Sequence, residues 1–179
     1  MKIIQAICTA VTALTLSACA THISPRDADV SASKEPLGTF QYYAIKPVAV
    51  AEGKKVHGKW IAAIERNLKE CMPLVFRDIQ PFDAAAVAAH PRALVIEPVV
   101  VDLKAVSVAK RIFLGPFPGS SAALVQVKFI DQDSKAVIAD PTFFSKGNAW
   151  GGAFTFGTTD ALMLTRTANE ICDYSRKNF

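Results

Sequence analysis

Apolar residues recur at helical spacing in two long segments of the chain. In residues 55–71, one face collects Val56, Trp60, Ile64, Leu68 and Cys71. A repeat of three or four residues predicts an amphipathic helix, and Pro73 ends it because proline cannot continue the hydrogen-bond pattern. A second face predicts a final helix from Thr158 or Thr159 to about Ser175, with Leu164, Ala168, Ile171, Cys172 and Ser175 on one side. The run Ala84 to Ala89 predicts a short third helix.

Several other segments carry strand patterns. Phe40 to Val50 is rich in aromatic and branched residues and predicts a first strand, and Leu74 to Ile79 predicts a short second one. Ala93 to Val108 predicts a long strand. Pro98 lies inside it, which implies a bulge or an edge position because proline lacks the amide hydrogen of a ladder.

The clearest pattern is a hairpin in the second half. In the segment Ala122 to Ile130, one face carries Val125, Val127 and Phe129, while Gln126 and Lys128 face the other way. Residues 131–135 are turn formers. Ala136 to Phe144 then predicts a returning strand, with Pro141 indicating an edge.

The order of these elements predicts an α+β fold with two layers. A mixed, roughly five-stranded sheet with two main helices on one face buries both apolar helix faces. The opening strand–helix–strand unit is expected to be parallel and the later hairpin antiparallel.

The first nineteen residues have the pattern of an export signal. Lys2 precedes an apolar stretch that is too short to span a bilayer, and small residues follow it. The last four, Leu16-Ser17-Ala18-Cys19, resemble the lipobox of bacterial lipoproteins. The resemblance implies that residues 1–18 are removed, that Cys19 carries lipid, and that two or more acyl chains give a stable anchor in the bilayer.

The position after the lipidated cysteine indicates where such a protein is sorted. Ala20 stands where Gram-negative lipoproteins of the inner membrane usually carry aspartate, so the resemblance implies the outer membrane, with the domain in the periplasm. Residues 19–38 then predict a lipidated cysteine and a flexible tether, because their composition buries little apolar surface. Nineteen such residues reach about 60 Å when extended. Residues 39–179 are predicted to form a single domain.

The predicted domain retains Cys71 and Cys172. An even pair of cysteines in an oxidising compartment indicates a disulfide, and both residues lie on apolar helix faces. The alternative is two separate buried thiols that pack as small hydrophobic groups.

Two segments mix glycine with large apolar residues, and both attach at the open end of the predicted hairpin. The candidate partner-binding residues are Phe113, Phe117, Trp150, Phe154 and Phe156. If these side chains are exposed, they form an apolar patch of the kind that marks a partner or membrane contact. The alternative is that they fold back and close the core.

Composition and charge exclude several classes of function. The net charge of +4 is small and spread along the chain, which argues against a nucleic-acid binder. His22, His57 and His90 have no metal-ligand spacing, so we expect no metal site and no cofactor. Asp131 and Asp133 are interpreted as turn formers, although a hydrolytic carboxylate pair stays open.

The last part of the chain resembles a family of short Gram-negative envelope lipoproteins known only as a domain of unknown function. The resemblance rests on Arg111 with Leu114-Gly115, Gly119-Ser120-Ser121, the turn from Asp131 to Val137, Gly151-Gly152, and the helix from Ala168 to Tyr174. It implies a compartment and a fold but no catalytic residues.

The expected function is therefore a non-enzymatic binding or scaffolding module for an envelope partner or for copies of itself. The alternatives are an accessory subunit of a transport or secretion assembly, a regulator of a cell-wall synthase, and a hydrolase of envelope polymers.

Overall fold

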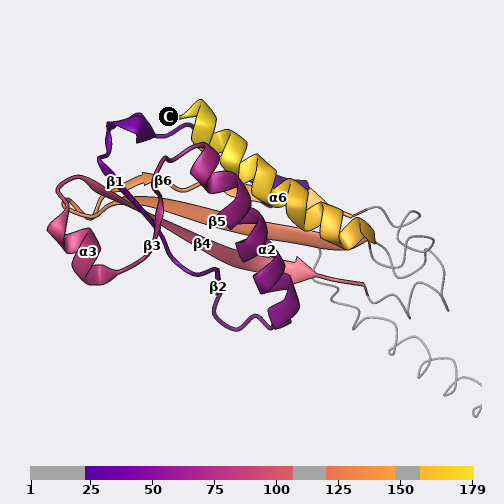
Figure 1. Ribbon diagram of the computed structural model, residues 1–179. Helices are drawn as coiled ribbons and strands as arrows, with labels where there is room; N and C mark the ends of the chain where they lie inside the picture. The colour runs from indigo at the N-terminus through magenta and orange to yellow at the C-terminus, as the bar shows by residue number, and fades with distance from the viewer. Residues whose placement is uncertain (1–22, 107–119, 148–157) are drawn as a thin grey trace, which may run out of the picture.

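The computed structural model describes residues 23–106, 120–147 and 158–179 of the chain (Figure 1). The strands are β1 (Tyr42–Ile45), β2 (Ala49–Val50), β3 (Gln80–Pro81), β4 (Ala93–Lys104), β5 (Ala122–Asp131), β6 (Val137–Ala139) and β7 (Thr142–Lys146). The helices are α2 (Gly58–Cys71), α3 (Ala84–Ala89) and α6 (Thr158–Lys177). Three single turns of 3-10 helix are η1 (Pro25–Asp27), η2 (Leu37–Thr39) and η3 (Met72–Leu74).

All seven strands belong to one mixed sheet. The order across the sheet is β3-β1-β4-β5-β6, with β2 beside β4 and β7 beside β5. Strand β1 runs parallel to β3 and β4, whereas β5 runs antiparallel to β4, β6 and β7. Because β2 continues the line of β1 and β7 continues that of β6, the seven strands fill five positions. The predicted two-layer α+β fold is confirmed.

Helices α2 and α6 lie side by side on one face of the sheet (Figure 1). The core between the layers includes Ile64 and Leu68 from α2, Leu164 and Ile171 from α6, and Phe129 from β5, all at most 1% exposed. The predicted alternation in β5 is confirmed, since its odd-numbered valines also belong to this core. Helix α3 covers part of the opposite face, where its Val87 contacts a second, smaller cluster.

A disulfide joins the last residue of α2, Cys71, to Cys172 of α6, with their Cα atoms 6.2 Å apart. The predicted pairing is confirmed, and the alternative of two separate thiols is wrong. The bridge fixes the two helices of the same layer to each other.

Two predicted strands have different boundaries in the structure. The first is interrupted between β1 and β2, because Pro47 has no amide hydrogen and the amide of Val48 donates to Glu65 of α2 (3.0 Å) instead. The strand predicted from Leu74 to Ile79 is wrong, since η3 ends at Leu74 and residues 75–78 continue as turns and a bend. Phe76 is fully buried there, so its apolar character reflects the core and not a sheet.

Pro98 is neither at an edge nor in a bulge, since β4 lies in the middle of the sheet and its bulge falls between Val100 and Asp102. On one side Pro98 pairs with Val127, whose amide donates away from β4 to Pro141 (2.9 Å). The nitrogen of Pro98 therefore points to the other side, where β1 and β2 are interrupted. The sheet therefore loses no backbone hydrogen bond through the missing amide hydrogen of Pro98.

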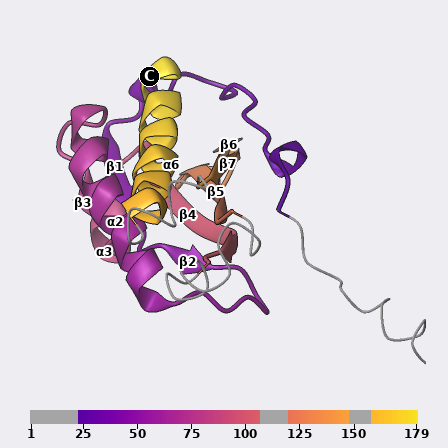
Figure 2. The ribbon, with the colours of Figure 1, turned by 90° about the vertical axis from the view of Figure 1, so that its right-hand side faces the viewer.

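The described part of the predicted tether lies against the domain (Figure 2). Residues 29–38, here called the strap, run along the outer edge of the sheet and across the end of α6. Asp29 and Thr142 exchange two backbone hydrogen bonds (3.0 and 2.6 Å), the amide of Lys34 donates to Ile138 (3.0 Å), and Leu37 is fully buried. These residues belong to the folded domain because the sheet edge and the helix end supply partners for their backbone.

Candidate functional site

Most of the predicted site residues lie outside the described residues. These are the lipidation site Cys19 and the candidate partner-binding residues Phe113, Phe117, Trp150, Phe154 and Phe156. The structure describes Cys71 and Cys172, whose bridge supports the fold.

The described ends of the two glycine-aromatic segments come together at one end of the sheet. Ala122 pairs with Lys146, the amide of Gly147 donates to the Ser121 carbonyl (2.8 Å), and the amide of Val106 donates to the Ser121 hydroxyl (3.0 Å). Both segments therefore attach at the open end of the hairpin, as the position of its turn predicts. Ser121 and the nearby Asp160 are at most 2% exposed, so polar side chains are buried at this attachment point.

A groove of about 460 Å³ lies beside β7, between the strap region and α6. Phe143 and Phe144 of β7 line it, with Val30 on the N-terminal side and Glu170 and Tyr174 on the α6 side. The Tyr174 hydroxyl donates to the Ser31 carbonyl (2.8 Å), which ties α6 to the strap. Burial, and then the negative charge of Asp29, raise the pKa of this phenol. The groove thus has an apolar strand on one side and a polar helix on the other.

The outer edge of β7 is only partly paired. Thr142 is bonded to Asp29, and a continued antiparallel strand would place Asp27 opposite Phe144 and Pro25 opposite Lys146. Instead, residues 25–27 form η1, which Ser24 and Asp27 cap reciprocally, so the chain turns away. In the described part of the chain, the outward amide and carbonyl of Phe144 have no partner. An open sheet edge of this kind is a template for another strand.

Ser145 and Glu170 form a partly buried polar contact next to the groove. The Ser145 hydroxyl, 2% exposed, donates to the Glu170 carboxylate (3.2 Å). Burial raises the pKa of Glu170, while the bond from Ser145 and the charge of Arg166 lower it in part.

We expect Glu170→Gln to stabilise the protein at neutral pH. A raised pKa means that the folded state holds this proton more tightly than the unfolded chain, so stability falls as pH rises from the ordinary value of 4.5 through the folded pKa. The variant should therefore match the wild type at pH 4 and exceed it at pH 7 by less than about 1 kcal/mol, because Glu170 is only half-buried. Urea unfolding at both pH values measures this difference. Asp173→Asn, an exposed change on the same helix, is the control, and an equal gain there would contradict the prediction.

The histidines and turn carboxylates that sequence singled out have local structural contacts. His57 caps α2 by accepting from the Lys59 amide (3.3 Å), and the His90 ring bonds the Ala86 carbonyl (2.7 Å) and stacks on Tyr42. His22 lies outside the described residues. Within the described ranges, no three histidine, cysteine or acidic residues are grouped to hold a metal ion.

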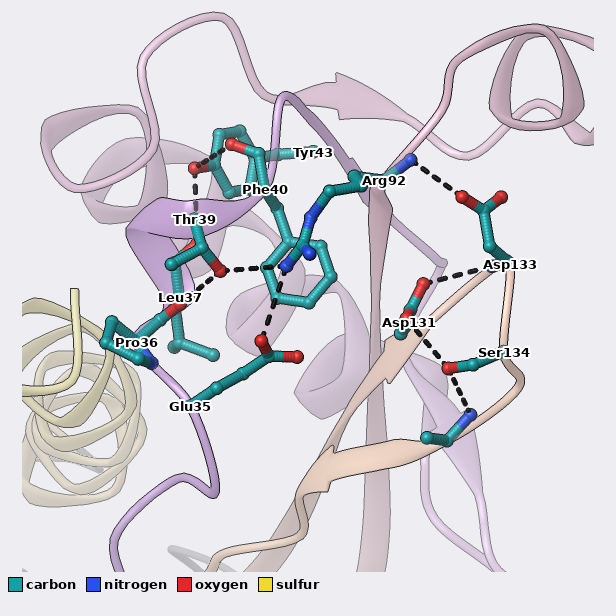
Figure 3. A network of polar contacts seen from close by, with 11 residues as sticks. Glu35, Pro36, Leu37, Thr39, Phe40, Tyr43, Arg92, Asp131, Asp133 and Ser134 are labelled. Carbon is teal, nitrogen blue, oxygen red and sulfur yellow. Dashed lines mark hydrogen bonds and ion pairs between the residues drawn. The ribbon is translucent and has the colours of Figure 1, made fainter.

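Asp131 holds the hairpin turn, and Asp133 ties that turn to Arg92, which lies beside the strap (Figure 3). Asp131 accepts from the Asp133 amide (3.0 Å) and the Ser134 hydroxyl (2.7 Å), and these bonds, the hydroxyl first, lower its pKa. Asp133 accepts from the amide of Arg92 (2.9 Å), whose side chain reaches Glu35 of the strap (3.3 Å). The Asp131 carboxylate is thus engaged within the turn, and the Asp133 carboxylate is engaged with the amide of Arg92.

No known family model matches the sequence, and no curated protein is similar to it. Several solved structures share its arrangement. The PelC dodecamer from Paraburkholderia phytofirmans is 14% identical, with 82% of this chain and 94% of that chain covered and a TM-score of 0.50. At this identity the likeness shows a common fold and nothing about function.

Two further solved structures have lower TM-scores. Protein XCC0632 from Xanthomonas campestris, assigned to the family model DUF330, is 9% identical over 83% of this chain and 93% of that one, with a TM-score of 0.45. A minor lipoprotein from Acinetobacter baumannii is 10% identical over 76% and 94%, with a TM-score of 0.40. A lipoprotein and a member of a family of unknown function are thus among the similar structures.

In the part of the chain that the structure describes, no helix is both long and apolar enough to cross a bilayer.

Proposed function

We propose that the protein is an envelope lipoprotein that acts by binding and not by catalysis. Cys19 anchors it in the outer membrane, and the domain faces the periplasm. There it assembles with copies of itself through the open edge of β7, so that several domains are held at the membrane surface.

The observation that carries this proposal is the backbone of Phe144 beside the groove, which has no partner among the residues that the structure describes. Its outward amide and carbonyl offer two hydrogen bonds to an added strand, and the groove accepts alternate side chains of that strand. Lys146 continues the same edge, and its carbonyl has one long bond, 3.4 Å from Arg166. Because the edge is short, the contact between two copies includes further surface beside β7.

The comparison with PelC supports assembly with copies of the same chain. That protein, which shares the fold, is described as a dodecamer. Pairing of two β7 edges about a two-fold axis closes at a dimer, whereas pairing of β7 with a different surface of the next copy gives a ring. The mass of the assembly distinguishes the two arrangements.

We expect Lys146→Pro to dissociate the assembly. Residue 146 is exposed and its amide points outward, so proline removes a bond to an added strand and leaves the β5–β7 ladder intact. Light scattering coupled to size-exclusion chromatography, across a range of protein concentrations, measures the mass. Lys146→Ala is the matched control because it removes the charge and keeps the amide.

Three outcomes contradict the proposal. A wild type that is monomeric at every concentration excludes assembly with itself. Equal dissociation by Lys146→Pro and Lys146→Ala assigns the contact to the side chain instead of the edge. A photocrosslinker at position 146 that captures only other envelope proteins in cells replaces self-assembly with the accessory-subunit alternative.

A further inference from the structure

The outer edge of β7 presents backbone groups to an added strand at two positions. The odd-numbered residues of β7 bond to β5 through their backbone, so the even-numbered ones direct amide and carbonyl outward. Thr142 is already bonded to Asp29 in both directions (3.0 and 2.6 Å). Phe144 and Lys146 remain, and the Lys146 carbonyl, which accepts one long bond from Arg166 (3.4 Å), has a second lone pair. The described edge therefore offers two amides and two carbonyls.

A second β7 strand fits these two positions in one antiparallel register. When Phe144 of each copy lies opposite Lys146 of the other, both residues form hydrogen-bonded pairs, and all four outward groups of each copy are used. Placing Phe144 opposite Phe144 instead would set Lys146 against Thr142, whose groups Asp29 already holds. Placing Lys146 opposite Lys146 would set Phe144 against a residue beyond the end of the strand. One register therefore uses every group that the edge offers and breaks no existing bond.

We propose that two copies of the chain pair through β7 in this register, about a two-fold axis that passes beside Ser145 of each copy. The inference rests on the proposed assembly through the β7 edge, to which it adds the register and the symmetry. The axis stands perpendicular to the sheet, so the two sheets join into one and both helix layers lie on the same face. Asp29 of each copy ends the shared ladder, and a larger assembly needs a further surface.

Charges of both signs meet beside this axis on the helix face of the joined sheet. The Ser145 hydroxyl donates to Glu170 (3.2 Å), and Arg166 donates to the Lys146 carbonyl (3.4 Å), so two side chains of α6 reach the edge. Because Lys146 lies opposite Phe144 in the pair, Arg166 of each copy is brought beside Glu170 of the other. Two arginines and two glutamates then surround the axis without net charge, which favours the self-complementary contact.

The remaining side chains along the edge are also compatible with a second copy. The other charged residues of the groove, Asp173 and Lys177, have opposite signs. On the face away from α6, the two Lys146 side chains are diagonal neighbours, and each lies opposite a Phe144 ring, whose face attracts a cation. Like charges are therefore not placed directly opposite each other along the described edge.

Single cysteine substitutions along β7 test the register, because only a residue on the axis lies opposite its own copy. In the proposed pair, the Cα atoms of the two residues at position 145 are about 4.5 Å apart, within the range of a disulfide. Mild oxidation of membranes from cells that express the full chain should therefore link Ser145→Cys into a dimer. Phe144→Cys and Lys146→Cys should stay at the wild-type background, because their own copies are about 8 Å apart, too far to be bridged. The wild type controls for reaction at Cys19.

Each alternative arrangement gives a different result. A dimer from Phe144→Cys or Lys146→Cys in place of Ser145→Cys overturns the register. If Lys146→Pro dissociates the assembly but none of the three cysteine variants links, β7 pairs with a different surface, so the two-fold axis is wrong while assembly through the edge stands. A wild type that is monomeric at every concentration contradicts the proposed function itself, and the register with it.

A mixed pair keeps the test decisive if Ser145→Cys itself fails to assemble. Phe144→Cys and Lys146→Cys, co-expressed with different tags, should then link to each other, because the proposed register sets their Cα atoms about 5.5 Å apart. Absence of that mixed dimer, in a sample that still assembles, overturns the proposed pairing.

Discussion

Removal of the disulfide by Cys71→Ala and Cys172→Ala together is expected to lower the free energy of unfolding by about 4–5 kcal/mol. The bridge closes a loop with a sequence separation of 101 residues, and the chain-entropy cost that it removes from the unfolded state grows with loop length. For a domain of this size, the loss corresponds to a fall in Tm of roughly 10–15 °C. Thermal unfolding followed by circular dichroism measures it.

The position of the bridge explains why the effect is large. It links the end of α2 to α6, and every strand from β3 to β7 lies in the loop between them. Few other polar contacts join the two helices, among them the Asn67 amide to the Thr165 hydroxyl at 3.3 Å. Without the bridge, α2 and α6 are held together mainly by apolar packing.

Reduction provides the control for this prediction. A reductant should lower the Tm of the wild type to that of the double alanine variant and should not change the variant. If the double variant instead lies within about 1 kcal/mol of the oxidised wild type, the bridge adds little to the apolar packing and the prediction fails.

The elements that sequence predicted well are those whose pattern is local. The face of α2 that carries Ile64 and Leu68, and the alternation through Val125 and Val127, follow from periods of 3.6 and 2 that each segment contains by itself. The same periodicity placed both cysteines on buried helix faces. That placement made the pairing predictable without any knowledge of the tertiary structure.

The errors arise where a distant partner decides the local structure. Phe76 is buried in the core after a turn, and the residues next to it in the chain do not predict this position. Pro98 tolerates a central strand because the neighbouring strand is interrupted opposite it. The strap is ordered by Thr142, Ile138 and Asn178, which lie more than a hundred residues away in the sequence.

The candidate binding surfaces also depend on contacts between residues that are far apart in the sequence. An open edge is a property of strand order, and the end of pairing at Thr142 depends on the turn η1 meeting β7. Neither contact is visible in a one-dimensional pattern. Leu37 of the predicted tether is fully buried whereas Val30 is exposed, so apolar character alone does not show which part of this segment is folded.

The strap also changes how far the domain stands from its anchor. The predicted tether of nineteen residues reaches about 60 Å when extended, but Asp29 is already bonded to Thr142. Only ten peptide units separate Cys19 from Asp29, and they span at most about 36 Å. If Cys19 is lipidated, the β7 side of the domain is therefore held close to the membrane surface, and copies of the chain meet there by diffusion in two dimensions.

Lipidation itself gives the largest expected change. We expect Cys19→Ala to abolish incorporation of labelled palmitate and to move the protein from the membrane fraction to the soluble fraction, because no acyl chain then holds it. Cys8→Ala is the matched control, since it removes a cysteine from the same predicted signal segment and should retain both label and membrane attachment. Both variants keep the Cys71–Cys172 bridge, so we expect a folded domain for Cys19→Ala in the soluble fraction and for Cys8→Ala in the membrane fraction. A Cys19→Ala protein that still takes up palmitate would exclude the lipobox, and with it the short connection through which the strap holds the domain at the membrane.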